Sequence, residues 1–171
     1  LALWADVNDT IAGRRAPQPL FFRVNSGSCI TFQHTNLIPA NYELDDFQVR
    51  TPTDIIGQHI HLVKFDVTSS DGSGNGWNYE DGTLAPEETI ERIRAINAAG
   101  GLLLPNGTRQ TLTPKAHPFF GTLGAKTTVQ RWYADPIVNN GGTDRTLRTV
   151  FTHDHFGPST HQQVGLYAGL V

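Results

Sequence analysis

Short runs in which apolar and polar residues alternate recur along the chain, and turn-forming residues separate them. The clearest runs cover residues 20–24, 30–33, 60–67 and 127–133. Alternation with a period of two places apolar side chains on one face of a β-strand, and the 17 glycines and 10 prolines supply turns between such strands. The pattern predicts an all-β domain, a sandwich or barrel in which we expect Greek-key connections.

One segment follows a helical period instead. A helix is predicted over about residues 86–99, because Pro86 suits a first helical turn and the following two glutamates suit the positive end of the helix dipole. Its isoleucines recur every three positions, at Ile90, Ile93 and Ile96. Gly100 ends the pattern. We expect the isoleucine face to pack over one end of the β-structure.

Segments rich in proline, glycine and serine predict how the chain divides into a linker, a domain and an insertion. Residues 1–19 read as a linker or strap, because they include a stretch rich in proline, glycine and arginine. Residues 20–171 form a single domain, since a chain of 171 residues suits one core. Within it, a loop rich in glycine and serine opens an insertion over residues 69–125 that contains the helix.

Composition and charge exclude several classes of function. The net charge of −3 and only 13 Lys plus Arg residues give no basic stripe for nucleic acid. No apolar run reaches the length of a membrane span, and the first residues lack the features of a signal peptide. The sequence begins at Leu1 and contains no methionine. We therefore expect an excised or processed piece of a larger protein.

Four of the seven histidines occur as two pairs at alternate positions: His59 with His61, and His153 with His155. In a strand, residues two apart share one face. Imidazole suits copper, zinc, iron and nickel, whereas magnesium and calcium prefer oxygen ligands. If the two strands are neighbours, about 4.8 Å apart, the four rings converge and fit metal ions held roughly 3.5 to 4 Å from each other. The pairs predict half of a polynuclear metal site, unless each is a surface pair or a hydrogen-bonded core pair.

Around these histidines the chain resembles the multicopper oxidase family. Residues 150–155 and 162–171 are similar to the end of a cupredoxin domain in that family, a His-x-His strand, a loop and a Gly-Leu-x-Gly closing strand. Residues 23–32, which precede the first pair, resemble a cupredoxin's opening strand. Residues 127–136 are similar to a segment of large bacterial multicopper oxidases, including manganese-oxidising ones. The resemblance spans roughly residues 20–68 and 126–171.

The resemblance implies a cupredoxin-like Greek-key β-sandwich or barrel that binds copper. It assigns His59 to the type 2 copper and His61, His153 and His155 to the type 3 pair of a trinuclear centre. Another cupredoxin domain or subunit would complete the centre, which reduces dioxygen to water while an organic or metal-ion substrate is oxidised elsewhere. The isolated chain would be inactive, and the family resemblance points to a secreted or periplasmic protein.

The chain departs from the redox-active domains of that family at the blue copper positions. Asp154 stands where those domains have a cysteine between the two histidines, Ile56 where they have a histidine, and Leu166 where an axial methionine would stand. A type 1 site needs a thiolate with imidazoles. We therefore expect no type 1 copper in this chain, and electrons must arrive from a blue copper elsewhere.

The remaining polar candidates have less specific patterns. Asp154 should face away from the histidines beside it and act as a hydrogen-bond acceptor, or orient the ligands and donate protons near the metal site. His161 is a further candidate metal ligand, although a structural role suits it better without a thiolate partner. Cys29 is expected to be a small buried hydrophobe. His34 and His117 are expected to be structural.

Two other functions remain open from the residues. One is a non-catalytic cupredoxin module that binds metal loosely or mediates oligomerisation. The other is a mononuclear enzyme of the cupin or zinc-hydrolase type. A cupin would have a glutamate shortly after the first His-x-His, and residues 62–65 offer none.

Overall fold

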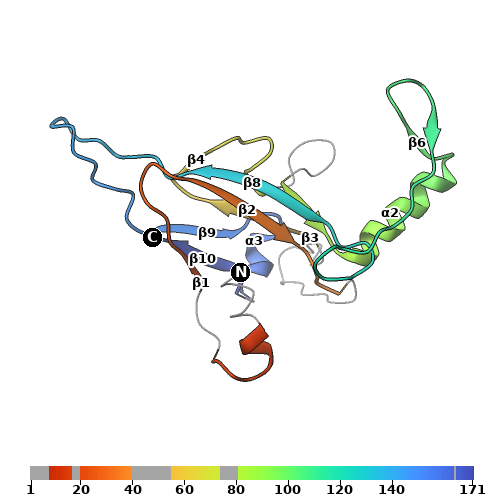
Figure 1. Cartoon of the computed structure of the whole chain (residues 1–171), viewed down its shortest axis with the longest axis horizontal. Helices are drawn as coiled ribbons and strands as arrows, with labels where there is room; N and C mark the ends of the chain where they lie inside the picture. Colours follow the sequence, from red (N-terminus) through yellow and green to blue (C-terminus); the bar gives the residue numbers. More distant parts are fainter. Residues whose placement is uncertain (1–7, 17–19, 40–54, 74–80, 164) are drawn as a thin grey trace.

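The computed structural model describes residues 8–16, 20–39, 55–73, 81–163 and 165–171, and there the chain is mostly β-sheet (Figure 1). Residues 1–7 and 17–19 of the expected linker, and the end of the loop that opens the insertion, lie outside the described residues. The all-β expectation is confirmed at this level.

Two sheets form the body. The larger has the order β1 (Leu20–Phe22), β10 (Tyr167–Leu170), β9 (Val150–Asp154), β3 (Ile55–Ile60) and β5 (Gly82–Leu84). The smaller has the order β2 (Cys29–Thr35), β8 (Thr127–Tyr133) and β4 (Lys64–Phe65). The β1–β10 pair is parallel and the other pairs are antiparallel. Within the described strands these sheets do not close into a barrel.

The core lies between these sheets. Its main cluster of buried apolar side chains consists of Ile60, Val63, Trp132, Val150 and Leu170. On β8 every second residue is buried, which turns Trp132 inward. The Phe32 ring stacks on Trp132 at a centroid distance of 4.8 Å. Burying each large apolar side chain contributes about 1.5–3 kcal/mol, which holds the sheets face to face.

The expected helix is confirmed as α2 (Pro86–Ala98), but its expected packing is wrong. Figure 1 shows α2 projecting away from the sheets together with the hairpin of β6 (Leu102–Leu103) and β7 (Arg109–Gln110). The returning segment covers the helix instead, because Asn97 exchanges two hydrogen bonds with the Leu112 backbone and Gly124 packs against Ile90. The isoleucine face therefore stabilises an arm and not the end of the sandwich.

Two further predictions are wrong, one about the strand over residues 60–67 and one about the burial of Cys29. The strand expected over residues 60–67 divides into β3 and β4, because Leu62 adopts a φ of 68° and the Val63 N–H bonds the His61 carbonyl. Cys29 is exposed rather than buried, because the residues of β2 that turn inward are Ile30, Phe32 and His34.

No helix in the described part of the chain is long and apolar enough to cross a membrane.

Candidate metal centre

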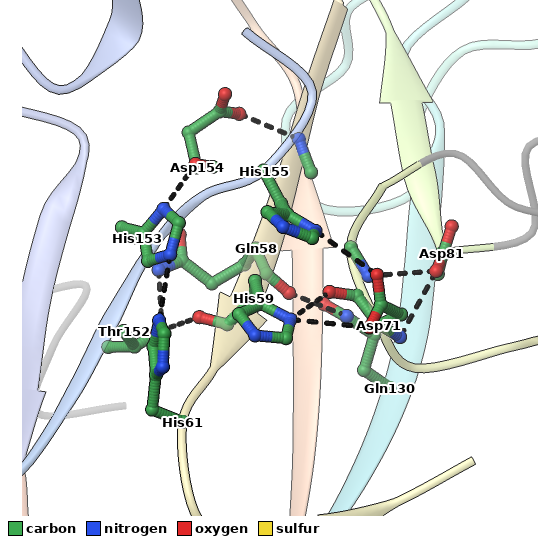
Figure 2. Close-up of polar contacts among 12 residues, drawn as sticks. Gln58, His59, His61, Asp71, Asp81, Gln130, Thr152, His153, Asp154 and His155 are labelled. Carbon is green, nitrogen blue, oxygen red and sulfur yellow. Dashed lines mark hydrogen bonds and ion pairs between the residues drawn. The ribbon is translucent and has the colours of Figure 1, made fainter. Parts of the chain in front are cut away.

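Strand pairing brings the two histidine pairs together. β3 and β9 are antiparallel neighbours, and their register places His59 directly opposite His153. His61 and His155 lie just beyond the ends of the same two strands. The expected convergence of the four rings is therefore confirmed, and Figure 2 shows them gathered on one face of the larger sheet.

Each of the four imidazoles contacts at least two of the others. The Nε2 atoms of His61 and His153 are 3.0 Å apart. The rings of His59 and His155 stack with a centroid distance of 4.2 Å. The His59 and His61 rings meet edge to face at 4.9 Å. Imidazoles so close together suit a shared metal site, since a neutral imidazole offers one nitrogen lone pair.

Two groups of donor atoms have the spacing of a metal site. One group is His59, His61 and His153, and the other is His59, Asp71 and His155. Within each group the donor atoms lie within 4.8 Å of one another. The groups share His59, so the face offers two overlapping ways to hold an ion.

Hydrogen bonds fix how three of the rings are turned. The Nδ1 atom of His59 bonds the Asp71 carbonyl at 2.7 Å, and that of His153 bonds the Asp154 carbonyl at 2.6 Å. His155 Nδ1 lies 3.1 Å from the Asp71 carboxylate. Because a carbonyl only accepts, Nδ1 must donate in His59 and His153, and Nε2 then carries the lone pair. Such bonds to the second ring nitrogen are typical of metal-ligating histidines.

Burial keeps two of these rings in the neutral form that binds metal. Desolvation lowers the pKa of His59, and it outweighs the opposing effect of the hydrogen bond to the Asp71 carbonyl. Desolvation likewise lowers the pKa of His153, with a smaller lowering from His61. Since protonation removes the lone pair, these lowered pKa values extend the pH range in which both rings are ligands.

Asp71 is the residue that sequence reasoning missed. It lies in the loop after β4, which the sequence pattern marks only as the start of the insertion. The Asp-Gly dipeptide in this loop predicts no more than a turn. The loop is held by Asp81, a fully buried residue whose carboxylate accepts hydrogen bonds from the Asp71 and Gly72 N–H groups. It also lies directly on β3, where a Cβ on Gly57 would overlap the Gly72 carbonyl oxygen. Figure 2 shows Asp71 beside His59 and His155.

Asp154 points to the other side of β9, as expected. Its carboxylate accepts hydrogen bonds from the Gly57 and Gly157 N–H groups and from His161 Nδ1, at 2.7–2.9 Å. His161 lies in α3 (Pro158–His161), is buried, and belongs to neither of the metal-like groups. The Asp154 carboxylate thus ties β9 to β3 and α3 from the inner side, and only its backbone carbonyl contacts a cluster imidazole.

The rim of the cluster is open and apolar. His61 is exposed, and the Phe151 ring, 42% exposed, stacks on His153 at 4.9 Å. Leu62 is 74% exposed and Tyr167, the register partner of His153 on β10, is 52% exposed. Large apolar groups around a polar cluster are typical of a surface that another protein surface covers.

The other histidines and the cysteine lie apart from the cluster. His117 has the structural role expected, since its Nε2 contacts Thr127 Oγ1 at 2.7 Å and its Nδ1 accepts backbone N–H bonds. Cys29 lies on β2 of the smaller sheet.

A comparison with models of known protein families found no match, and a search of curated proteins found none either.

Proposed function

We propose that this chain is a cupredoxin-like domain of a multicopper oxidase, and that it supplies half of the imidazole ligands of a trinuclear copper centre. The observation that carries the proposal is the register of β3 and β9, which sets His59 against His153 and gathers four imidazoles on one face. Non-consecutive neighbours in the larger sheet support a Greek-key arrangement of the cupredoxin type.

The donor set fits copper. It offers four imidazoles, and imidazole sites favour copper over zinc in affinity. The 3.0 Å separation of the His61 and His153 Nε2 atoms agrees with two ligands of one ion, since metal–nitrogen bonds of about 2.0 Å place adjacent ligand atoms roughly 3 Å apart. In the proposed assignment His59 serves the type 2 copper, and His61, His153 and His155 serve the type 3 pair.

Four imidazoles cannot saturate three metal ions, so the proposal includes a partner. The exposed His61 and the apolar rim of Phe151, Leu62 and Tyr167 support a second cupredoxin domain or subunit on this face. A thiolate for a blue copper is missing from the cluster among the described residues, since Cys29 lies on the smaller sheet. The electrons therefore come from a blue copper in the partner.

Within this function the chain's own residues orient ligands and shield the site. Copper held there would supply the redox chemistry that reduces dioxygen to water while a substrate is oxidised elsewhere. The Nδ1 hydrogen bonds of His59 and His153 hold both rings ready, so little reorganisation accompanies binding. Asp154 holds β9 in position, because its carboxylate accepts hydrogen bonds from the Gly57 and Gly157 N–H groups on the inner side of the sheet.

The test is copper titration of the chain, followed by electron spin resonance and visible absorption. We expect a type 2 signal and no intense blue band. The double change His59→Ala and His153→Ala removes a ligand from each strand and should weaken copper binding by at least about 100-fold. His117→Ala, a histidine outside the cluster, is the matched control and should bind copper as the original chain does. Unchanged copper binding by the double variant would end the proposal.

A further inference from the structure

The carboxylate of Asp71 lies between two of the cluster imidazoles, on the side of their Nδ1 atoms. One oxygen, Oδ1, is 3.4 Å from His59 Nδ1, and the other, Oδ2, is 3.1 Å from His155 Nδ1. His59 lies on β3, Asp71 lies in the loop after β4, and His155 directly follows β9. This convergence is separate from the contact between His61 and His153 on the other side of the cluster.

We propose that His59, Asp71 and His155 form a mononuclear site for a divalent transition-metal ion, bound through both Nδ1 atoms and the carboxylate. The proposal rests on the geometry of these three residues and not on the copper function, although it shares two histidines with it. Zinc and iron(II) are the ions that two imidazoles and one carboxylate suit best among the common metals.

The charge of the donor set favours a divalent cation. The His61–His153 side offers neutral nitrogens only, whereas this group adds a carboxylate, and the attraction between a carboxylate and a cation strengthens as water is excluded. The side chains of His59 and Asp71 are 14% and 15% exposed, while that of His155 is 35% exposed. The group is therefore sheltered but open on one side, where water or a small ligand can complete the coordination.

The loop that carries Asp71 is held in place before an ion arrives. The His59 and His155 rings are stacked with a centroid distance of 4.2 Å and an interplanar angle of 22°, so one ring must tilt for both in-plane Nδ1 lone pairs to meet one ion. Asp81 accepts two backbone N–H bonds from the loop and so prevents Asp71 from swinging away. A carboxylate on a loop held in this way loses little conformational entropy when it binds an ion.

Binding at Nδ1 excludes the use of the same rings by copper. A neutral imidazole has one lone pair, so an ion at Nδ1 leaves the proton on Nε2. His59 Nδ1 must also release its hydrogen bond to the Asp71 carbonyl. The mononuclear ion and the shared copper centre are thus alternative states of one face, and the single ion must leave before copper takes His59 and His155.

Zinc alone is the probe for the test, because it has no redox chemistry and gives sharp nuclear magnetic resonance spectra. Calorimetric titration of the full chain should show one zinc ion per chain, and Asp71→Asn should weaken it by at least about tenfold while it preserves side-chain shape. His61→Ala is the matched control. It leaves the mononuclear group intact and should keep the original zinc affinity, although it removes a proposed copper ligand.

Nitrogen-15 spectra of the histidine rings supply a readout that needs no variant. In the zinc-loaded chain we expect the metal-induced shift at Nδ1 of His59 and His155, with their Nε2 atoms protonated. Zinc at the Nε2 atoms, or unchanged zinc affinity in Asp71→Asn, would overturn the inference. Neither result depends on copper binding by the His59→Ala and His153→Ala double variant, so each proposal can fail alone.

Discussion

A histidine on the inner face of the smaller sheet makes the stability of the chain sensitive to pH. His34 turns into the space between the sheets, and its Nδ1 atom has no hydrogen-bond partner among the described residues. Burial lowers the pKa of His34 to about 4, against an opposing effect of the Asp154 charge. The folded chain therefore keeps this ring neutral in mild acid, where the unfolded chain protonates it.

The pH dependence of stability follows from the sign of that shift. Between pH 6.5 and about 4 the unfolded chain binds a proton at His34 that the folded chain does not, so the free energy of unfolding falls as the pH falls. The loss reaches at most about 3 kcal/mol and levels off below pH 4. Urea unfolding at pH 7 and pH 4.5 should show a smaller acid loss in His34→Leu. An equal loss in both proteins would contradict the assignment.

At the scale of single residues, sequence patterns identified the four clustered histidines and predicted that the Asp154 side chain faces away from them, because alternate spacing on a strand is a local property. The same reasoning missed Asp71 and misplaced Cys29. Asp71 lies in a loop whose position depends on Asp81 and Gly57, and no periodicity reports such contacts.

At the scale of elements, close packing of the 69–73 loop on β3 decides where Asp71 lies. Gly57 and Gly72 allow this approach, since a Cβ on either glycine would overlap backbone atoms of the other segment. The close approach at these two glycines thus determines where the Asp71 carboxylate lies.

The change Gly57→Ala tests this packing. The added methyl group must push the loop off β3, so we expect a loss of about 1–3 kcal/mol in the free energy of unfolding, and zinc binding weakened by about tenfold. Urea unfolding and zinc titration measure the two effects. Gly141→Ala is the control, because its Cβ would meet only the Asn139 side chain at 3.4 Å. Similar behaviour of the two variants would argue against the packing role.

At the scale of the whole molecule, the arm of α2, β6 and β7 projects away from the two sheets (Figure 1). Pro86 is the only buried residue of α2, and Leu102 and Leu103 of the hairpin are 41% and 59% exposed. At the base of the arm the returning segment packs tightly on the start of α2, since a Cβ on Gly124 would lie 2.5 Å from the Pro86 carbonyl oxygen.

Removal of the arm should therefore leave the sandwich and its histidines intact. We expect a chain with residues 87–123 replaced by a short glycine-serine linker to keep its β-sheet circular dichroism and its copper binding. The lost bond between His117 and Thr127 should cost about 1 kcal/mol of stability. Loss of copper binding without unfolding would show that the arm contributes to the metal face.

The sequence by itself determined most types of element and the identity of the four clustered histidines, because strand alternation, the signals for a first helical turn and the spacing of the histidines are written within a few neighbouring residues. Only the tertiary structure decided that His59 lies opposite His153, that Asp71 joins them and that α2 points away from the sheets. Those features depend on pairing and packing between segments far apart in the chain. Their free energy comes from contacts that no local pattern specifies.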